Sequence, residues 1–363
     1  MKRIFTALKM MGSLALCAAL LAGCAVLPAD SAPEAAPPAD PLTGLEARWP
    51  CQRPVAVTIA NGTASTTQWG ISTASVVLEA RTADYGDTSL CLVYPSVDAM
   101  PQVGPVTEGE DLYWRLLVGQ QVLPVQRGGG VFDQNYLDYY SLRAVDALEV
   151  GKNAFSCTTA WQNAPLWYTS GGAVSGVLSS LNISASLMES RVTSAASGSG
   201  ASGGAALTVP PLLPQAVDGK LPDATAPDAR NIRICFDDAN ATGFAYDEAR
   251  GQYAMLHADG APQLDAGSGR QAAFDNLLVL FSGSTLRDDG HTYDYDLTMG
   301  VWLNGGHLWY LTWTQGSDST FQLYDADGRL LTLEAGTSYI ALVSSVTGQE
   351  LTVTNAAGEN LIQ

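Results

Sequence analysis

Along the first half of the chain, the spacing of apolar positions changes between that of a strand and that of a helix. Residues 54–60 alternate like a strand, and the apolar run at 90–94 has the length of a buried strand. Leucines at helical spacing predict a helix at 109–120. Strands that alternate with helices predict an α/β domain over residues 41–192. The other elements expected here are a helix or strand at 73–80, a strand at 122–125, and helices at 136–148 and 173–181.

The second half carries the pattern of hairpins. Asn-Gly or Asp-Gly pairs stand at 259–260, 304–305 and 327–328, between alternating segments such as 308–314. Such pairs favour the positive φ of tight hairpin turns. Residues 231–350 are therefore predicted to form a mostly antiparallel β domain.

Composition marks the segment between the two predicted domains. Residues 193–230 are rich in Ser, Gly and Ala, then in Pro, and show no apolar period. Such a stretch is typical of a linker or a long surface excursion. The last residues, 351–363, are expected to form a C-terminal tail.

The first residues have the pattern of an export signal. Lys2, Arg3 and Lys9 precede a short apolar segment at 10–20. This segment is too short to span a membrane as a helix, so residues 1–23 are predicted to be a cleavable signal peptide.

The four residues 21–24, Leu-Ala-Gly-Cys, match the lipobox of bacterial lipoproteins. In a lipobox the cysteine thiol takes a diacylglyceryl group, so Cys24 is the expected lipidation site, and the membrane is an expected partner through this lipid. Residues 24–40 are Ala- and Pro-rich and have little to bury, which predicts a solvated tether. The predicted location is therefore extracytoplasmic, with the protein lipid-anchored to the cell membrane. An ordinary signal peptide without lipid is the alternative.

The chain is strongly acidic. Its formal net charge is −18, and loss of Lys2, Arg3 and Lys9 with the signal peptide takes it to −21. An acidic surface repels nucleic acid and anionic lipid headgroups. No nucleic acid is expected as a partner.

Four cysteines belong to the body of the chain: Cys51, Cys91, Cys157 and Cys235. Because they have no Cys-x-x-Cys spacing, they do not predict a zinc site. One or two disulfides and four free thiols are both open outside the cytoplasm.

Several short motifs, in this order, resemble the YerB-like bacterial lipoproteins. The motifs are 41–45 (PLTGL), 53–57 (RPVAV), 103–106 (VGPV), 128–129 (GG), 164–165 (AP) with 168–169 (YT), 276–281 (NLLVLF) and 324–328 (YDADG). The resemblance spans nearly the whole mature chain. It implies an N-terminal and a C-terminal domain of unknown function, and it brings neither an established reaction nor a cofactor.

The chain departs from that family pattern at positions that usually carry charge. After Val-Gly-Pro-Val the pattern has Arg-Ser-Ala-Arg, and here residues 107–110 are Thr-Glu-Gly-Glu. Ser89 stands where an Arg is usual, and Gln126 and Leu166 each stand where a His is usual. If the usual members hold an anion with these arginines, the resemblance implies that this chain has lost the charge to do so.

The sequence offers little support for a nucleophilic enzyme or a metal site. His257, His291 and His307 all stand beside turn residues, and no Gly-x-Ser-x-Gly elbow lies between a strand and a helix. The acidic residues around His291, at 288–296, have the spacing of a solvent-facing strand more than of a cation site. We therefore expect no catalytic residue of this type and no metal.

Two residue groups leave alternatives open. Asp84, Asp87, Glu108, Glu110 and Asp111 could supply paired carboxylates for glycoside chemistry if they are neighbours. The tryptophans within 302–313 could form an aromatic binding face, but in a β domain they are more often core.

The sequence thus predicts a membrane-anchored extracytoplasmic lipoprotein that binds or scaffolds an envelope component or a protein partner. The alternative is a cell-envelope hydrolase or transferase that uses a carboxylate pair; a spacer role for the β domain is a third hypothesis. One cleft of the α/β domain is expected to carry the recognition site. Its candidate residues are Glu79, Thr107, Glu110, Gln126, Arg127 and Tyr168.

Overall fold

The computed structural model describes ten stretches of the chain, and the statements below concern these residues. The stretches are 37–62, 67–82, 88–159, 165–188, 208–219, 226–237, 240–287, 290–293, 298–345 and 349–362. The predicted signal peptide, Cys24 and nearly all of the predicted tether lie outside them.

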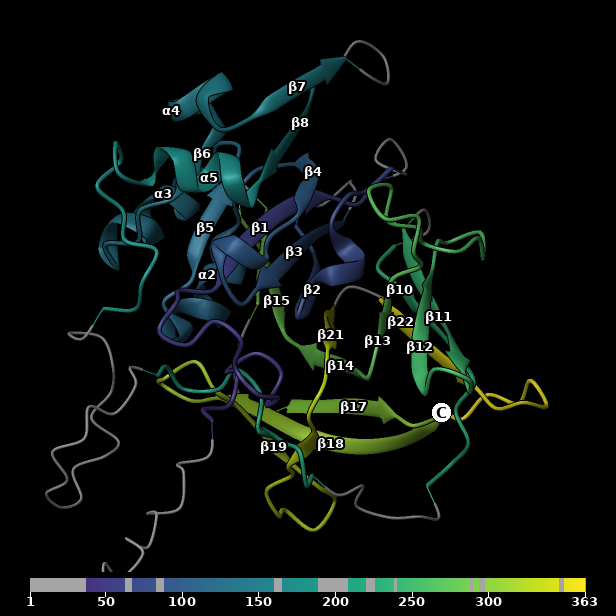
Figure 1. The fold of residues 1–363 in the computed structure, drawn as a ribbon. Coiled ribbons are helices and arrows are strands. Elements are labelled where there is room, and N and C mark those ends of the chain that lie inside the picture. The colour runs from purple at the N-terminus through teal and green to yellow at the C-terminus, as the bar shows by residue number, and fades with distance from the viewer. Residues whose placement is uncertain are drawn as a thin grey trace, which may run out of the picture. The chain divides into compact units, whose positions relative to one another are not determined.

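A mixed sheet of thirteen strands forms the centre of the body (Figure 1). Strands from the first half of the chain are β1 (Val55–Ala60), β2 (Val76–Arg81), β3 (Thr88–Tyr94), β4 (Gln102–Val106), β5 (Leu123–Gln126), β6 (Val145–Asp146), β7 (Ser156–Thr159) and β8 (Pro165–Ser170). Strands from the second half are β14 (Asn276–Ser282), β17 (Thr298–Asn304), β18 (His307–Gln315), β19 (Phe321–Tyr324) and β21 (Ser338–Ser344). Strand β21 pairs in parallel with both β14 and β2, so the two halves of the chain share one sheet.

Helices are few and short. They are α2 (Asp111–Leu117), α3 (Val131–Tyr139), α4 (Ala147–Val150) and α5 (Gly171–Leu178), with 3-10 turns η2 (Ile71–Thr73), η3 (Val97–Ala99), η4 (Val118–Gln120) and η5 (Gly151–Asn153). None of these helices is long and apolar enough to cross a membrane.

The expected α/β alternation holds only coarsely. Strands make up 44% of the structure and helices 15%, so the fold is mainly β. Helices alternate with strands from β4 through α2, β5, α3, β6 and α4 to β7. The first three strands instead pair antiparallel, β1 and β2 each with β3, and the only helical element in the described residues between them is the 3-10 turn η2.

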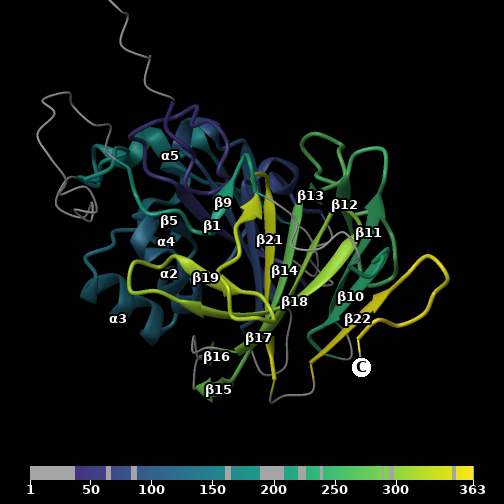
Figure 2. The same cartoon turned by 90° about the horizontal axis from the view of Figure 1, so that it is seen from below.

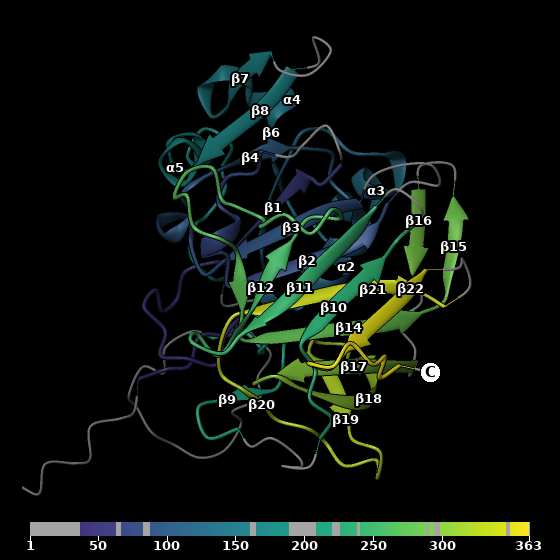
Figure 3. The ribbon, with the colours of Figure 1, turned by 90° about the vertical axis from the view of Figure 1, so that its right-hand side faces the viewer.

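A second sheet of five antiparallel strands lies against the central sheet (Figure 3). Its strands are β10 (Asn231–Cys235), β11 (Ala241–Asp247), β12 (Gln252–Leu256), β13 (Ala273–Phe274) and β22 (Glu350–Thr354). Residues 351–354 of the expected C-terminal tail belong to this sheet, since β22 pairs with β10 along its whole length. Two small ribbons complete the fold: β15 (Ser284–Arg287) with β16 (Gly290–Tyr293), and β9 (Gln215–Ala216) with β20 (Leu333–Glu334).

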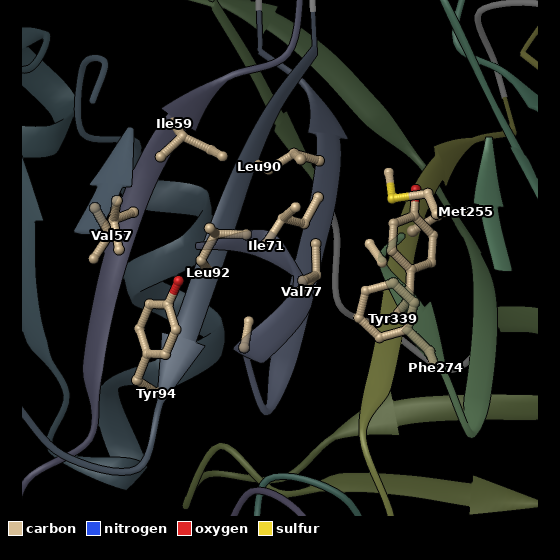
Figure 4. Packing of buried hydrophobic residues seen from close by; sticks show 14 of the residues in the cluster. Val57, Ile59, Ile71, Val77, Leu90, Leu92, Tyr94, Met255, Phe274 and Tyr339 are labelled. Atoms are coloured by element: carbon tan, nitrogen blue, oxygen red, sulfur yellow. The ribbon is translucent and has the colours of Figure 1, made fainter. Parts of the chain in front are cut away.

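Both faces of the central sheet are buried, which its near-continuous apolar strands require. On one face, Val77 and Tyr339 belong to a cluster that includes Phe274 and Met255 of the five-stranded sheet. Figure 4 shows the ring of Tyr339 beside Met255 and Phe274. Alternation along each strand therefore divides the core into two apolar layers.

The opposite face carries a second cluster, to which α2 and strands β17, β18 and β19 contribute (Figure 2). Leu78 and Ile340 of neighbouring strands join Trp114 of α2 in this second cluster. Trp302 and Trp313 are fully buried in it and Trp309 is 8% exposed. The core interpretation of these tryptophans is confirmed.

The helix predicted at 136–148 is wrong in position. The structure places α3 earlier and follows it with β6 and α4. The inner side of α3 presents Asp133 and Leu137, one turn apart, and Asp133 is only 2% exposed. A buried aspartate breaks the apolar pattern on which the prediction relied, and Ser141, at φ +51°, ends the helical course.

The predicted linker differs from the structure over residues 208–219. Leu212 and Leu213 are buried in the second cluster, and β9 pairs with β20. The two leucines between prolines supply the apolar area that holds this stretch on the body.

All four body cysteines are free thiols. Cys91 is buried in β3, and burial raises the pKa of its thiol. Cys157 is exposed, and Cys51 and Cys235 are half-buried.

Because β21 joins strands of both halves, we expect the body to unfold in one cooperative transition. A core substitution in β21 should then lower the free energy of unfolding of the whole body. Ile340→Ala removes a fully buried side chain, and it should lower the free energy of unfolding by about 2–5 kcal/mol. Urea denaturation, monitored by far-UV circular dichroism and by tryptophan fluorescence, measures the number of transitions and the free energy of unfolding.

The matched control for Ile340→Ala is Met299→Ala, which truncates a side chain of β17 that is 62% exposed. Its expected effect lies within about 0.5 kcal/mol. Two separate transitions, or equal losses in both variants, would contradict a shared core.

Candidate functional site

A cavity of about 420 Å³ lies where β2 and the start of β3 meet β11 and β12 of the five-stranded sheet. Its polar side consists of Asn61, Glu79, Thr88 and Thr242. The size falls within the range of small-molecule pockets, and the meeting of two sheets is a common place for one.

Glu79 is the buried centre of this polar side, with 1% of its surface exposed. Its Oε1 accepts hydrogen bonds from Asn61 Nδ2 at 2.8 Å and from Thr88 Oγ1 at 2.6 Å. Thr242 Oγ1 lies 3.0 Å from Oε1 and 2.8 Å from Oε2, and Tyr339 OH donates to Oε2. Side chains from both sheets thus converge on one carboxyl group.

The hydrogen bonds continue beyond Glu79 as a chain of amides. Asn61 Oδ1 accepts from Gln68 Nε2 at 2.9 Å, and Gln68 Oε1 accepts from Gln263 Nε2 at 2.9 Å. Gln68 and Gln263 are each 1% exposed. A buried polar network that is satisfied in this way fixes the relative positions of its members.

Burial sets the electrostatics of this site. Loss of hydration raises the pKa of Glu79, and the four hydrogen-bonding neighbours lower it only in part. The pKa of Tyr339 is also raised, first by burial and then by the adjacent Glu79 carboxylate. All hydrogen-bond donors to Glu79 are neutral groups, and no lysine or arginine of the described chain forms an ion pair with it.

The opposite wall and the rim come from β12 and the turn after it. Met255 and Leu256 supply apolar surface, and His257 and Asp259 follow them. Burial lowers the pKa of His257, so its ring is neutral at pH 7, while Asp259 is exposed. The cavity therefore combines an apolar wall, a hydrogen-bonded polar wall and an acidic rim.

The structure does not bring the six predicted cleft residues into one cleft. Glu79 lies on the face of the central sheet that meets the five-stranded sheet, while Gln126, in register next to Thr58, projects from the other face. Successive side chains of a strand point to opposite faces, and the sequence order of the motifs carries no information on which face each one takes.

Four of the six predicted cleft residues do lie near one another: Thr107, Glu110, Gln126 and Arg127. Thr107 O accepts from Arg127 N at 2.8 Å, and Glu110 precedes α2 directly. Gln126 is fully buried, and a Cβ atom on Gly109 would stand 2.1 Å from its Oε1. Glycine is therefore required at 109 for this close approach.

Gln126 contacts two carboxylates on this second face. Its Nε2 lies 2.9 Å from Asp133 Oδ2 and 3.4 Å from Asp146 Oδ2. Trp114 Nε1 donates to Asp133 Oδ1 at 2.6 Å. Burial raises the pKa of Asp133 to about 6, although these hydrogen bonds act in the opposite direction. An open groove beside it is lined by Gln126, Asp146 and the end of α3.

Tyr168 lies away from both groups of residues. It belongs to β8, is 8% exposed, and its ring meets that of Trp69 edge-on at 6.3 Å. Leu166 and Trp167 are half-buried in the same strand. No side chain of this strand is among those that line the Glu79 cavity.

The acidic residues considered as carboxylate pairs or as a cation site do not come together in one site within the described residues. Asp84 and Asp87 lie outside them, as do Asp288, Asp289, Asp294 and Asp296. Asp111 forms an ion pair with Arg287 at 2.6 Å. Within the described chain, no group of three or more His, Cys, Asp or Glu side chains is placed to hold a metal ion.

Sequence reasoning named Glu79 but missed the residues that define its site. Thr242 and Tyr339 reach Glu79 from β11 and β21, across sequence separations of 163 and 260 residues. Asn61 and Gln68 carry no motif. The one available signal was Glu79 itself, a lone acidic residue inside an apolar strand, which must find partners when it is buried.

Comparisons with known proteins identify the family. Residues 42–184 match the N-terminal domain, and residues 232–340 the C-terminal domain, of the family described as "Protein of unknown function (DUF3048)". The chain therefore belongs to the DUF3048 family.

The crystal structure of the YerB protein from Bacillus subtilis is similar to this chain, with a TM-score of 0.70 and 20% sequence identity over 87% of this chain and 99% of that one. The expected resemblance to YerB-like proteins, as a divergent member, is confirmed, and at this identity the likeness to YerB shows the fold. A comparison with curated proteins gives no match.

Asp133 predicts a specific pH dependence of stability. Its folded-state pKa of about 6 lies above the ordinary 3.8, so the folded chain holds the proton more tightly than the unfolded chain does. The stabilisation from this group is present below pH 4 and is lost as the pH rises through about 6, a change of about 2–3 kcal/mol. Asp133→Asn should therefore gain about this much relative to the unsubstituted protein between pH 4 and pH 7, as measured by urea unfolding.

The control for Asp133→Asn is Asp138→Asn, an exposed position on the same helix. Its stability should follow the pH profile of the unsubstituted protein. A parallel profile for Asp133→Asn would show that the carboxyl is not held protonated by burial.

Proposed function

We propose that this protein is a membrane-anchored extracytoplasmic lipoprotein that binds a small polar ligand of the cell envelope in the Glu79 cavity. The observation that carries the proposal is a cavity of about 420 Å³ with an apolar wall on one side and a rigid, hydrogen-bonded polar wall on the other. Small-molecule sites have this character: mostly apolar lining with a few fixed polar groups.

The network around Glu79 supports binding over proton transfer. The two carboxyl oxygens accept from four side chains, which fills the acceptor positions of a carboxylate. A general acid or base needs an oxygen within hydrogen-bond reach of the substrate. Glu79 instead orients Asn61, Thr88 and Thr242 at the cavity surface.

The alternative of a carboxylate-pair hydrolase has one observation in its favour. Glu79 and Asp259 line the same cavity, and the pKa of Glu79 is raised, as a general acid requires. Asp259, however, is exposed at the rim, and Glu79 has its acceptor positions filled. We therefore keep hydrolysis as the second candidate.

Membrane anchoring rests on the sequence around Cys24, which has the small residues and the preceding leucine of a lipobox. Two acyl chains suffice for stable anchoring. In this proposal the tether holds the body outside the membrane, and its acidic charge keeps nucleic acid from being a partner.

Cys24→Ser should abolish lipidation. In a bacterial host fed an alkyne-labelled fatty acid, the protein should take up label, and the Cys24→Ser variant should take up none. Cys17→Ser, which changes the other cysteine of the signal segment, is the control and should be labelled like the parent. Label retained by Cys24→Ser would rule out this anchor.

Ligand binding is tested by thermal shift on residues 38–363, which form one compact unit. The panel holds muropeptides, glycan fragments and short peptides. A ligand at one hundred times its dissociation constant adds about 2.7 kcal/mol to stability, which a melting curve resolves. We expect at least one member of the panel to raise the melting temperature.

Ala258→Trp places a large ring at an exposed position of the cavity rim and should remove the shift. Ala249→Trp, at an exposed turn of the same sheet that does not line the cavity, should leave the shift unchanged. A panel without any shift, or a shift that survives Ala258→Trp, would contradict binding at this site.

A further inference from the structure

We propose that the ligand of the Glu79 cavity is a small organic cation, a protonated amine whose ammonium group binds the hydroxyl oxygens of Thr88 and Thr242 beside Glu79. This inference rests on the proposed binding function and adds the chemical class of the ligand. It follows from a charge imbalance in the cavity wall.

Among the residues that the structure describes, Glu79 is a buried acid without a basic partner. Each of its hydrogen bonds comes from an amide or hydroxyl group, and 1% of its surface is exposed. Buried carboxylates in proteins are ordinarily paired with a cation or bound to a metal. Here the space beside the carboxyl is a cavity, so a cationic ligand can supply the missing charge.

The rest of the cavity adds negative charge and no positive charge. Of the side chains that line it in the described chain, the titratable ones are Glu79, His257 and Asp259. His257 is neutral at pH 7 because burial disfavours its charged form. Arg233 donates to the carbonyl of Ala258 at 2.8 Å from an exposed strand position and does not line the cavity.

The charge of the whole chain has the same sign. The mature chain carries a net charge of −21 once the signal peptide is removed. Such a field raises the local concentration of cations and repels anions.

Hydrogen-bond chemistry also favours a donor over an acceptor as the ligand. Asn61 Nδ2 already donates to Glu79 and Thr88, and the hydroxyl protons of Thr88 and Thr242 point to Glu79. These hydroxyl groups can therefore offer a ligand only the lone pairs of their oxygen atoms. An ammonium group, with three donors and no acceptor, matches them, and the carbon chain of the amine can lie on Met255 and Leu256.

Pairs of probes that differ in the charge of one or two groups test directly whether the site prefers a cationic ligand. The pairs are 1,5-diaminopentane with 1,5-pentanediol, and D-glucosamine with D-glucose, titrated into residues 38–363 at pH 7 by isothermal calorimetry. We expect the amine of at least one pair to bind at least tenfold more tightly than its neutral match. Glu79→Gln keeps the shape of the side chain and should reduce that ratio to within about twofold of one, since the Coulomb attraction is removed.

Two further variants separate the local effect from the field of the whole protein. Glu350→Gln removes one charge from an exposed position of β22 and should keep the tenfold preference. Asp259→Asn, at the exposed rim, should lower the preference two- to threefold and keeps the test available if Glu79→Gln does not fold.

The outcomes distinguish the ligand class from the proposed function. Equal or tighter binding of the neutral probes, abolished by Ala258→Trp, would overturn the cation class and leave the cavity as a binding site. An amine preference that survives Glu79→Gln would also overturn it. If no probe binds while the wider panel gives a shift sensitive to Ala258→Trp, the cation class is wrong and binding stands; if no compound shifts the protein at all, both fail.

Discussion

The pairing of β21 with β2 on one side and β14 on the other is the constraint on which the rest of this structure depends. Both pairings are parallel, so neither can be made by a tight hairpin, and the chain returns to the centre of the sheet only near its C-terminal end, at β21. Once β21 is in place, its alternate residues complete both apolar layers, with Tyr339 on one face and Ile340 on the other. The five-stranded sheet then has a surface on which to pack.

The same strand carries the polar contact that organises the candidate site. Tyr339 brings a hydroxyl group to Glu79, and Thr242 brings a second from the other sheet. A carboxyl group buried without these donors would be strongly destabilising, so the network specifies how the two sheets align. The cavity where the sheets meet has this network as its polar wall.

The central sheet also separates the chemistry of its two faces. Glu79 and its amide neighbours belong to one face, and Gln126 with Asp133 belongs to the other. Each cluster contains a carboxyl group whose pKa is raised by burial. In the described chain the Glu79 cluster borders the cavity where the two sheets meet, and the Gln126 cluster lies beside a groove near α3.

The sequence by itself determined the local elements and the family. Strand patterns predicted β1 and β3, leucine spacing predicted α2, and ordered short motifs indicated a YerB-like protein. It also included Glu79 among the six candidate cleft residues, by its position among the motifs. The position of α3 was missed because a buried aspartate, Asp133, interrupts the apolar period from which helices are read.

Only the tertiary structure decided how these elements combine. Two segments that read as an α/β and a β domain share one sheet, since hydrogen bonding between distant strands leaves no local pattern in either strand. For the same reason the six residues predicted for one cleft are distributed over both faces of that sheet and its edge. The partners of Glu79 lie up to 260 residues away in sequence. Local patterns fix which side chains are buried, but the long-range pairing of strands decides which buried groups meet.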